Sequence, residues 1–202
     1  MKKIKIALVL MASTVLFSCG TSHSKRILVY ASSDIKVDAS QKNIIVTEGT
    51  THHEKVLDFP GSGTITLNVE SPTGKYSLEA TDDGLYIANL KPDTLVGSYQ
   101  QVGTDNGTVK ITPERKEAMI DSLEKLVNGS NISASNKNYF IKPHSMVWIT
   151  KTVNAKIFGP FTTIPSGFDA STVPEIYKFY KVDDERAIIE NLKKLGELNS
   201  GK

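Results

Sequence analysis

The chain has 202 residues, of which 39% are hydrophobic and 23% charged, a composition typical of a folded globular protein and not of a disordered spacer. It carries 24 Lys and Arg residues against 22 Asp and Glu, but residues 1–18 contain three lysines and no acid. The remainder therefore has 21 basic and 22 acidic residues, a balance that argues against a nucleic-acid partner. A single cysteine, Cys19, excludes an intramolecular disulfide.

The first 18 residues have the organisation of a secretory signal peptide. A basic start at residues 1–5 precedes an apolar stretch at 6–17, which is too short to span a bilayer. Leu16-Phe17-Ser18-Cys19 closes this stretch and resembles the lipobox of bacterial lipoproteins, with a Leu three residues before the Cys and a small residue just before it. The resemblance implies cleavage between Ser18 and Cys19, diacylglycerol on the Cys19 sulfur, and a fatty acid such as palmitate on the new amino end. Because two or more acyl chains anchor a protein stably, the lipid bilayer is the expected partner of Cys19.

The residues after Cys19 extend this resemblance to a location in the cell envelope. By analogy with the sorting rule of enteric bacteria, Gly20 at the next position favours the outer membrane. Lipoproteins that the Bacteroidota export to the cell surface often carry an acidic cluster here, whereas this chain has Ser24-Lys25-Arg26. The resemblance is therefore to a Bacteroidota-type envelope lipoprotein in the periplasm-facing leaflet, and it does not extend to the mature domain.

Residues 19–26 are interpreted as a lipidated tether and residues 27–165 as a β-rich globular domain. The clearest strand is 64–70, where Ile65, Leu67 and Val69 alternate with polar residues. The turn at 71–74 predicts a hairpin, and Asp82-Asp83-Gly84 predicts a turn before a strand at 85–90. Short strands separated by regular turn signals predict an antiparallel β-sandwich or barrel-like domain.

Two helical segments interrupt or follow the predicted strands. Thr112 and Pro113 are a typical N-cap and first residue for an internal helix at about 113–128. Residues 166–202 are predicted to form a helical C-terminal tail, with helix at about 174–198. Within the tail, residues 174–180 are expected to form a short helix. A longer helix follows, with Ile188, Leu192 and Leu195 as its apolar stripe.

The sequence contains one cluster that is typical of metal sites, His52-His53-Glu54. Adjacent residues of a strand point to opposite faces and zinc needs three or four ligands, so His52 and His53 are weak metal candidates and an exposed polar turn is favoured. Asp82-Asp83-Gly84 lacks the alternating acids of a calcium loop, which favours a plain turn. No Gly-x-Ser-x-Gly elbow, Walker loop or dinucleotide fingerprint is present, so neither a catalytic residue nor a cofactor is assigned.

Aromatic residues supply the candidate contact surface. Trp148, with Tyr139 and Phe140 nearby, is a candidate platform on which a sugar ring stacks. Phe158 and Phe161 flank a Gly-Pro turn and are candidates for an exposed contact loop. For both groups, packing in the core is the alternative interpretation.

The leading functional hypothesis is a membrane-anchored module with a non-enzymatic binding or structural role, acting on an envelope protein or glycan. The first alternative is a periplasmic hydrolase or metal-dependent enzyme, which requires its side chains to converge in one pocket. Its candidate residues are His52, His53, Glu54, Asp82 and Asp83. The second alternative is an accessory subunit of an envelope complex, docked through the stripe of Ile188, Leu192 and Leu195.

Overall fold

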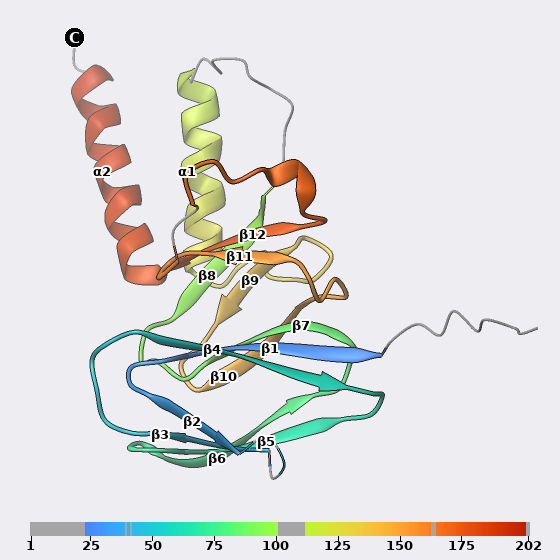
Figure 1. The fold of residues 1–202 in the computed structure, drawn as a ribbon. Helices are drawn as coiled ribbons and strands as arrows, with labels where there is room; N and C mark the ends of the chain where they lie inside the picture. Colours follow the sequence, from blue (N-terminus) through green and yellow to red (C-terminus); the bar gives the residue numbers. More distant parts are fainter. Residues whose placement is uncertain (1–22, 39, 41, 101–111, 163–164, 201–202) are drawn as a thin grey trace, which may run out of the picture.

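The computed structural model describes residues 23–38, 40, 42–100, 112–162 and 165–200. The expected signal peptide, with Ser18 and Cys19, lies outside the described residues. Within the described part, twelve strands form three four-stranded sheets, accompanied by two α-helices and the short 3₁₀ helix η1 (Ala170–Thr172) (Figure 1). The prediction of a mainly β, sandwich-like domain is therefore confirmed.

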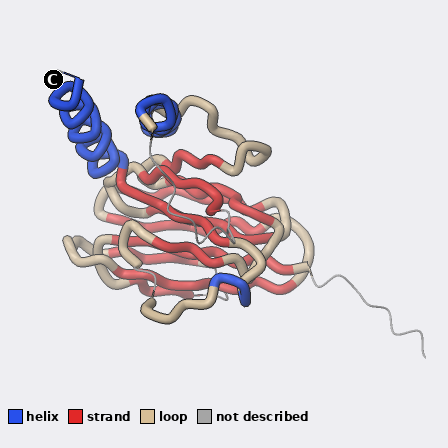
Figure 2. Tube along the Cα trace, turned by 90° about the horizontal axis from the view of Figure 1, so that it is seen from above, coloured by secondary structure: helices blue, strands red, loops and turns tan. Residues whose placement is uncertain are grey.

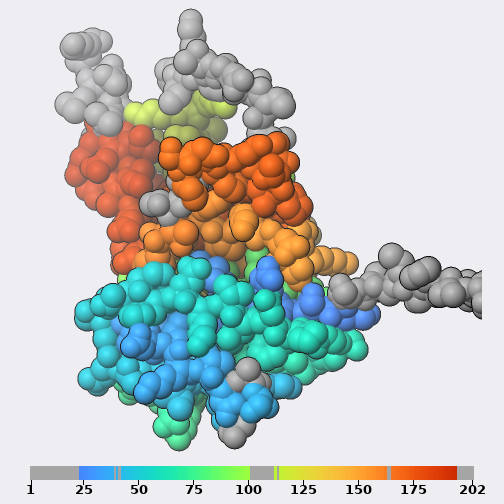
Figure 3. All heavy atoms as spheres, viewed as in Figure 1, coloured from blue at the N-terminus to red at the C-terminus, as the bar shows by residue number. Residues whose placement is uncertain are grey.

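The three sheets are stacked as layers, and the helices stand on the third layer (Figure 1). The lower sheet has the order β2-β3-β5-β6, with the strands Ile35–Asp38, Asn43–Val46, Ile65–Ser71 and Gly74–Ala80. The central sheet has the order β10-β7-β1-β4, with the strands Ser145–Thr150, Gly84–Asn89, Ser24–Ala31 and His53–Pro60. The upper sheet has the order β11-β12-β8-β9, with the strands Lys156–Phe158, Ile176–Lys181, Leu95–Gln100 and Asn138–Ile141. Figure 3 shows the early part of the chain in the lower half and residues beyond about 140 above it.

Strand β1 is buried on both faces because the central sheet lies between two others. Ile27, Val29 and Ala31 belong to the core shared with the lower sheet. Leu28 and Tyr30 point the other way, into the core shared with the upper sheet. All five are at most 7% exposed. Two-sided burial explains why this strand reads as a continuous apolar run and not as an alternating one.

The hairpin predicted from the alternating strand is confirmed in the lower sheet. Strands β5 and β6 pair antiparallel from Ile65 opposite Ala80 to Ser71 opposite Gly74. Leu67 and Val69 are 0% and 2% exposed and face the lower core. A sheet with only one buried face shows this alternation clearly.

Pairing within the sheets is mixed, which corrects the expectation of an antiparallel domain. β1 pairs parallel with β7, β3 with β5, and β11 with β12, and the other six strand pairs are antiparallel. Parallel neighbours need a long crossover connection. Between β1 and β7 that connection contains the entire lower sheet and β4, so the chain returns to the central sheet in the direction in which it left.

The internal helix α1 (Pro113–Val127) is confirmed with its cap, since the Thr112 side chain accepts a hydrogen bond from the Arg115 amide. The expected short helix at 174–180 is wrong, because Ile176–Lys181 form strand β12. Tyr177 and Phe179 of β12 fill the upper core, and aromatic side chains of this kind favour strands. Gly97 of β8 lies opposite Phe179, and a Cβ at that glycine would overlap the phenyl ring.

The second helix, α2 (Val182–Ser200), buries a different face from the predicted stripe. Val182 and Ile189 pack into a third core with the end of α1, whereas Ile188 is 46% exposed. Leu192 is half-buried, and the side chain of Leu195 lies outside the described ones. Figure 2 shows α1 nearly end-on, so this helix projects from the upper sheet instead of lying flat across it. Among the described residues, no helix has both the length and the apolar character needed to cross a bilayer.

Truncating β1 is expected to destabilise the chain much more than the same truncation on its neighbour β4. Val29→Ala leaves a cavity at a fully buried site and should lower the free energy of unfolding by about 2 to 3 kcal/mol. Val56→Ala is the matched control, because Val56 is 49% exposed, and it should lower that free energy by less than about 1 kcal/mol. Urea unfolding of the two purified variants measures both values, and equal losses would contradict the burial of β1 against the lower sheet.

Candidate functional site

Polar and aromatic side chains gather at both ends of β1. The register places Ser24 opposite Pro60 at the start of the strand and Ala31 opposite His53 at its end. Eight residues of strand span about 23 Å at 3.3 Å per residue, so the two groups are well separated. We call them the tether-end cluster (His23, Lys25, Asp83 and Trp148) and the distal cluster (Tyr30, His52, Lys91 and Phe161).

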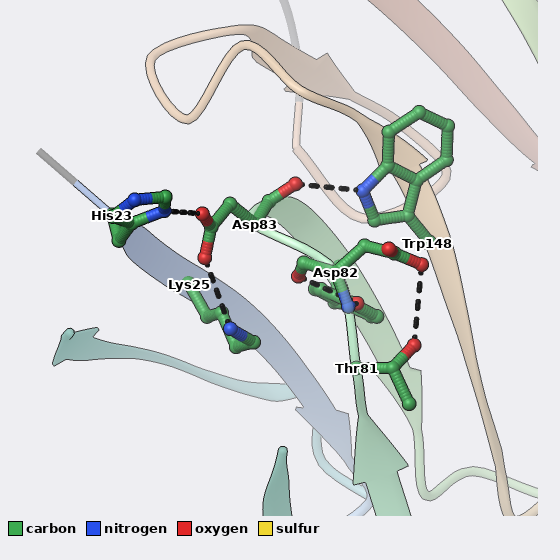
Figure 4. A network of polar contacts seen from close by, with 7 residues as sticks. His23, Lys25, Thr81, Asp82, Asp83 and Trp148 are labelled. Atoms are coloured by element: carbon green, nitrogen blue, oxygen red, sulfur yellow. Dashed lines mark hydrogen bonds and ion pairs between the residues drawn. The ribbon is translucent and has the colours of Figure 1, made fainter. Parts of the chain in front are cut away.

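The tether-end cluster is built around Asp83 (Figure 4). Its carboxylate contacts His23 Nδ1 and accepts a hydrogen bond of 3.0 Å from Lys25 Nζ. Its backbone carbonyl accepts a hydrogen bond of 3.0 Å from Trp148 Nε1. The hydrogen bonds from His23 and then Lys25 hold the pKa of Asp83 below its ordinary value. Lys25 is 1% exposed and lies in β1, which therefore begins within the segment interpreted as a tether.

The turn that carries Asp83 is fixed by its own backbone contacts. The Asp82 amide donates to Tyr86 Oη at 2.9 Å, and the Tyr86 hydroxyl donates to the Asp82 carbonyl at 2.8 Å. Gly84 has φ +135°, and a Cβ there would overlap the carbonyl oxygen of Thr150. The predicted plain turn thus presents Asp83 to β1 in a set orientation.

The distal cluster surrounds the ring of Phe161, which lies in the loop after β11. The imidazole of His52 stacks on this ring with centroids 4.2 Å apart and planes 16° apart. Tyr30 meets it edge-on at 5.7 Å, and Lys91 Nζ lies 4.4 Å from its centroid. Tyr30 and Lys91 are 1% and 5% exposed. The cluster therefore joins the end of β1, the start of β4, the residues after β7 and a loop of the upper sheet.

Several polar atoms of the distal cluster lack hydrogen-bond partners. In the described part of the chain, the buried side-chain atoms without a partner are Tyr30 Oη, His52 Nδ1, His52 Nε2 and Glu185 Oε2. Three of these four belong to this one cluster. Lys91 Nζ donates a hydrogen bond of 3.3 Å to the Ala31 carbonyl, and no ion pair of Lys91 is found within the described residues. Each unpartnered buried group disfavours folding by about 1 to 3 kcal/mol, so such a concentration requires a reason.

Burial sets the protonation states in the distal cluster. Desolvation lowers the pKa of His52, and the charges of Lys91 and His53 lower it further. Desolvation also lowers the pKa of Lys91, and it raises the pKa of Tyr30 well above the ordinary tyrosine value. His52 is therefore a neutral imidazole near pH 7, with one N–H donor and one acceptor nitrogen, and Tyr30 keeps its hydroxyl proton.

Charged residues flank the cluster without pairing with Lys91. Lys181 Nζ lies 5.4 Å from the Phe161 centroid and forms an ion pair of 3.5 Å with Asp93. Glu54 Oε2 is 3.8 Å from His52 Nε2, which is longer than a hydrogen bond, and it accepts one of 3.2 Å from Thr162 Oγ1. The Glu54 side chain is 35% exposed, so it retains contact with solvent.

The two adjacent histidines point apart, as predicted. His53 Nδ1 lies 3.1 Å from Asp34 Oδ1, whereas His52 belongs to the distal cluster. The expected exposed turn is wrong for His52, because Phe161, more than a hundred residues later, covers its ring. No group of three or more His, Cys, Asp or Glu side chains among the described residues is arranged to hold a metal.

The residues proposed for an enzyme do not converge. His52 and Glu54 lie near the end of β1, whereas Asp83 contacts its beginning. His53 is paired with Asp34, and the Asp82 carboxylate accepts a hydrogen bond of 3.2 Å from Thr81. One pocket that contains all five candidate side chains is therefore not formed.

The expected aromatic platform is divided among three cores. Trp148 packs against the lower core, Tyr139 lies in the upper core, and Phe140 contacts the helical core. Phe158 is 5% exposed and meets Phe168 edge-on at 5.0 Å, so it is a packing residue. Of the three predicted contact residues, Phe161 alone lies in the cluster with unpartnered polar atoms.

In a third polar cluster, around Glu175, the polar side-chain atoms have hydrogen-bond partners. The Glu175 carboxylate accepts hydrogen bonds from Thr150 at 2.5 Å, Tyr177 at 3.1 Å and Lys137 at 3.3 Å. These three donors satisfy both carboxylate oxygens in a partly buried position. The tether-end cluster is satisfied in the same way, and the distal cluster is not.

Comparisons with protein-family models, curated proteins and solved structures found no match to this chain. Candidate functional residues are therefore assigned from their own geometry. By that criterion the distal cluster is the candidate binding site, and the tether-end cluster has a structural role.

Protonation of Asp83 is expected to weaken the domain at acid pH. The pKa of Asp83 in the folded chain lies below the unfolded value of about 3.9. Ionised Asp83 therefore stabilises the fold above that pH, and this stabilisation is lost as the pH falls through the lowered pKa. Asp83→Asn should therefore flatten the decline of stability below about pH 4, and the neighbouring change Asp82→Asn should preserve it. Thermal unfolding across this pH range measures the effect, and identical profiles for wild type and Asp83→Asn would refute the role of Asp83.

Proposed function

We propose that this chain is an envelope lipoprotein, anchored by acylated Cys19, whose β domain is a non-enzymatic binding module with its ligand site at the distal cluster. The observation that carries the proposal is the group of unpartnered buried atoms on Tyr30 and His52. The proposed location is the periplasm-facing leaflet of the outer membrane, which follows from the lipobox-like residues and the non-acidic segment after them.

The attachment of the tether to the fold supports an anchored role. The chain enters the domain at His23, directly before β1, and β1 pairs with β4 over eight residues and with β7 over six. A force applied along the tether is therefore directed along β1, and it is resisted together by the hydrogen bonds to β4 and to β7. The His23 carbonyl accepts a hydrogen bond of 2.8 Å from the Gly61 amide, and Asp83 holds the side chains of His23 and Lys25. These contacts resist peeling of β1 from its tethered end.

The positions of the two clusters support binding away from the membrane. The tether-end cluster marks the end of β1 to which the anchor connects, and the distal cluster lies about 23 Å further along the strand. A ligand at the distal cluster therefore does not compete with the anchor for space. A binding site needs polar groups that complete the hydrogen bonds of a ligand. The enzyme alternative requires its five candidate side chains to meet in one pocket, and they do not.

The anchor is tested by intact mass and membrane fractionation of wild type beside Cys19→Ala. Wild type should fractionate with the outer membrane and carry acyl mass on a chain that begins at Cys19, because thioether lipid and an acylated amino end give stable anchoring. Cys19→Ala should lose both properties. Ser18→Ala is the matched control and should keep both, since a small residue still precedes the cysteine. Unmodified wild-type protein in the soluble fraction would overturn the anchored role.

A further inference from the structure

Lys91 is a buried cation without a counter-ion among the described residues. Its side chain follows β7, is 5% exposed, and donates one hydrogen bond to the Ala31 carbonyl. A buried charge strongly disfavours folding unless it is paired, with an effective penalty of several kcal/mol for each ion. Lys181, whose ammonium also lies near the Phe161 ring, has Asp93 as its ion-pair partner. Lys91 therefore has no ion-pair partner among the described residues, and only the Asp93 charge, from a longer distance, favours its protonated form.

Two further side chains of the distal cluster have buried hydrogen-bonding groups without partners. Tyr30 offers an unpartnered hydroxyl, and neutral His52 offers one unpartnered N–H. The ring of Phe161 is common to all of them, since His52, Tyr30 and Lys91 each contact it within 6 Å. An apolar ring cannot accept these hydrogen bonds or neutralise the ammonium, although it gains a cation–π contact. The part of this position next to Lys91 is thus better suited to a group with negative charge, whereas the flat face of His52 suits a stacked ring.

We propose that the distal cluster binds the carboxylate of a small organic acid and that Phe161 covers this site in the free chain. One ammonium without an ion pair matches a singly charged carboxylate better than a phosphate dianion. The carboxylate would accept hydrogen bonds from Lys91 and the Tyr30 hydroxyl, and the flat body of an aromatic acid would replace Phe161 on the imidazole of His52. This assignment rests on the proposed function, because it names the ligand class for the same site.

Uncovering the site requires only a local movement. Phe161 is held by ring contacts, by packing on the upper core and by the two lysines. The Thr162 carbonyl accepts a hydrogen bond of 2.6 Å from the Gly159 amide, which closes the turn that carries Phe161 and can move with it. Outside this turn, the Thr162 hydroxyl donates a hydrogen bond of 3.2 Å to a Glu54 carboxylate that is 35% exposed. Such a bond contributes about 0.5 to 1.5 kcal/mol, and partial exposure weakens it. Both residues lie in a loop, so the sheets keep their pairing when the ring leaves.

The test is an NMR titration of the histidine rings in the purified full-length chain, with benzoate as the probe. The chain has four histidines, and His52→Gln assigns the relevant signal. Benzoate at millimolar concentration should shift the His52 signal and leave His23, at the other end of β1, unchanged. Benzamide has the same shape without the charge and should bind about tenfold more weakly or worse.

Variants separate the roles of the cation and the covering ring. Lys91→Met should weaken benzoate binding about tenfold or more while the chain stays folded, since removing an unpaired buried charge does not destabilise a core. Lys181→Met is the matched control, and its effect should stay below about threefold because Lys181 is paired with Asp93. Phe161→Ala should strengthen binding, because the ligand no longer has to displace the ring.

Four results would overturn the carboxylate site. These are an unshifted His52 signal, an equal response to benzoate and benzamide, an equal response to benzoate and inorganic phosphate, and undiminished binding by Lys91→Met. The titration does not depend on membrane attachment. If the chain proves soluble and unmodified, the proposed anchor is refuted, and the titration still tests the carboxylate site. Conversely, if the chain is membrane-anchored but benzoate does not shift the His52 signal, only the proposed ligand class is refuted.

Discussion

Two-sided burial of β1 is the constraint on which the rest of the structure depends. The lower sheet covers one face of this strand and the upper sheet covers the other, so its side chains take part in both large cores. A strand in this position cannot carry polar residues near its middle without leaving them unsatisfied. Polar and charged groups therefore lie at the two ends, where the chain enters the strand at His23 and where loops of different sheets meet.

The two ends differ in how well their polar groups are partnered. At the tether end, the Asp83 carboxylate contacts His23 and accepts a hydrogen bond from Lys25, and Trp148 donates to its backbone carbonyl. At the distal end, a buried ammonium, a phenol and an imidazole each contact one phenyl ring, and the phenol and imidazole rings also contact each other. The first arrangement stabilises the fold. The second disfavours folding, and a bound carboxylate would remove much of that disadvantage, which is the usual relation between a strained site and its ligand.

Most of the fold, but little of the candidate site, was predictable from the sequence. Alternation in β5 and the Thr112 cap are local signals, and both gave the correct element. β12 was misread as helix because its aromatic residues have no clear period, and its pairing with β8 is a tertiary effect. His52 and Phe161 were singled out separately, and their stacking across the fold has no local signal. Lys91 was missed, although a lysine that follows the buried strand 84–89 and the apolar Leu90 is a feature that pointed to a covered cation.

The pKa of the Lys91 ammonium, measured by NMR in a lysine-labelled full-length chain with and without benzoate, tests the central claim most directly. In the free chain, burial without an ion pair should hold this pKa below the ordinary lysine value of about 10.4, because desolvation outweighs the distant charge of Asp93. Bound benzoate should raise it, because a neighbouring negative charge favours the protonated form. An ordinary pKa that benzoate does not change would mean that Lys91 is solvated and that the distal cluster is not an anion site.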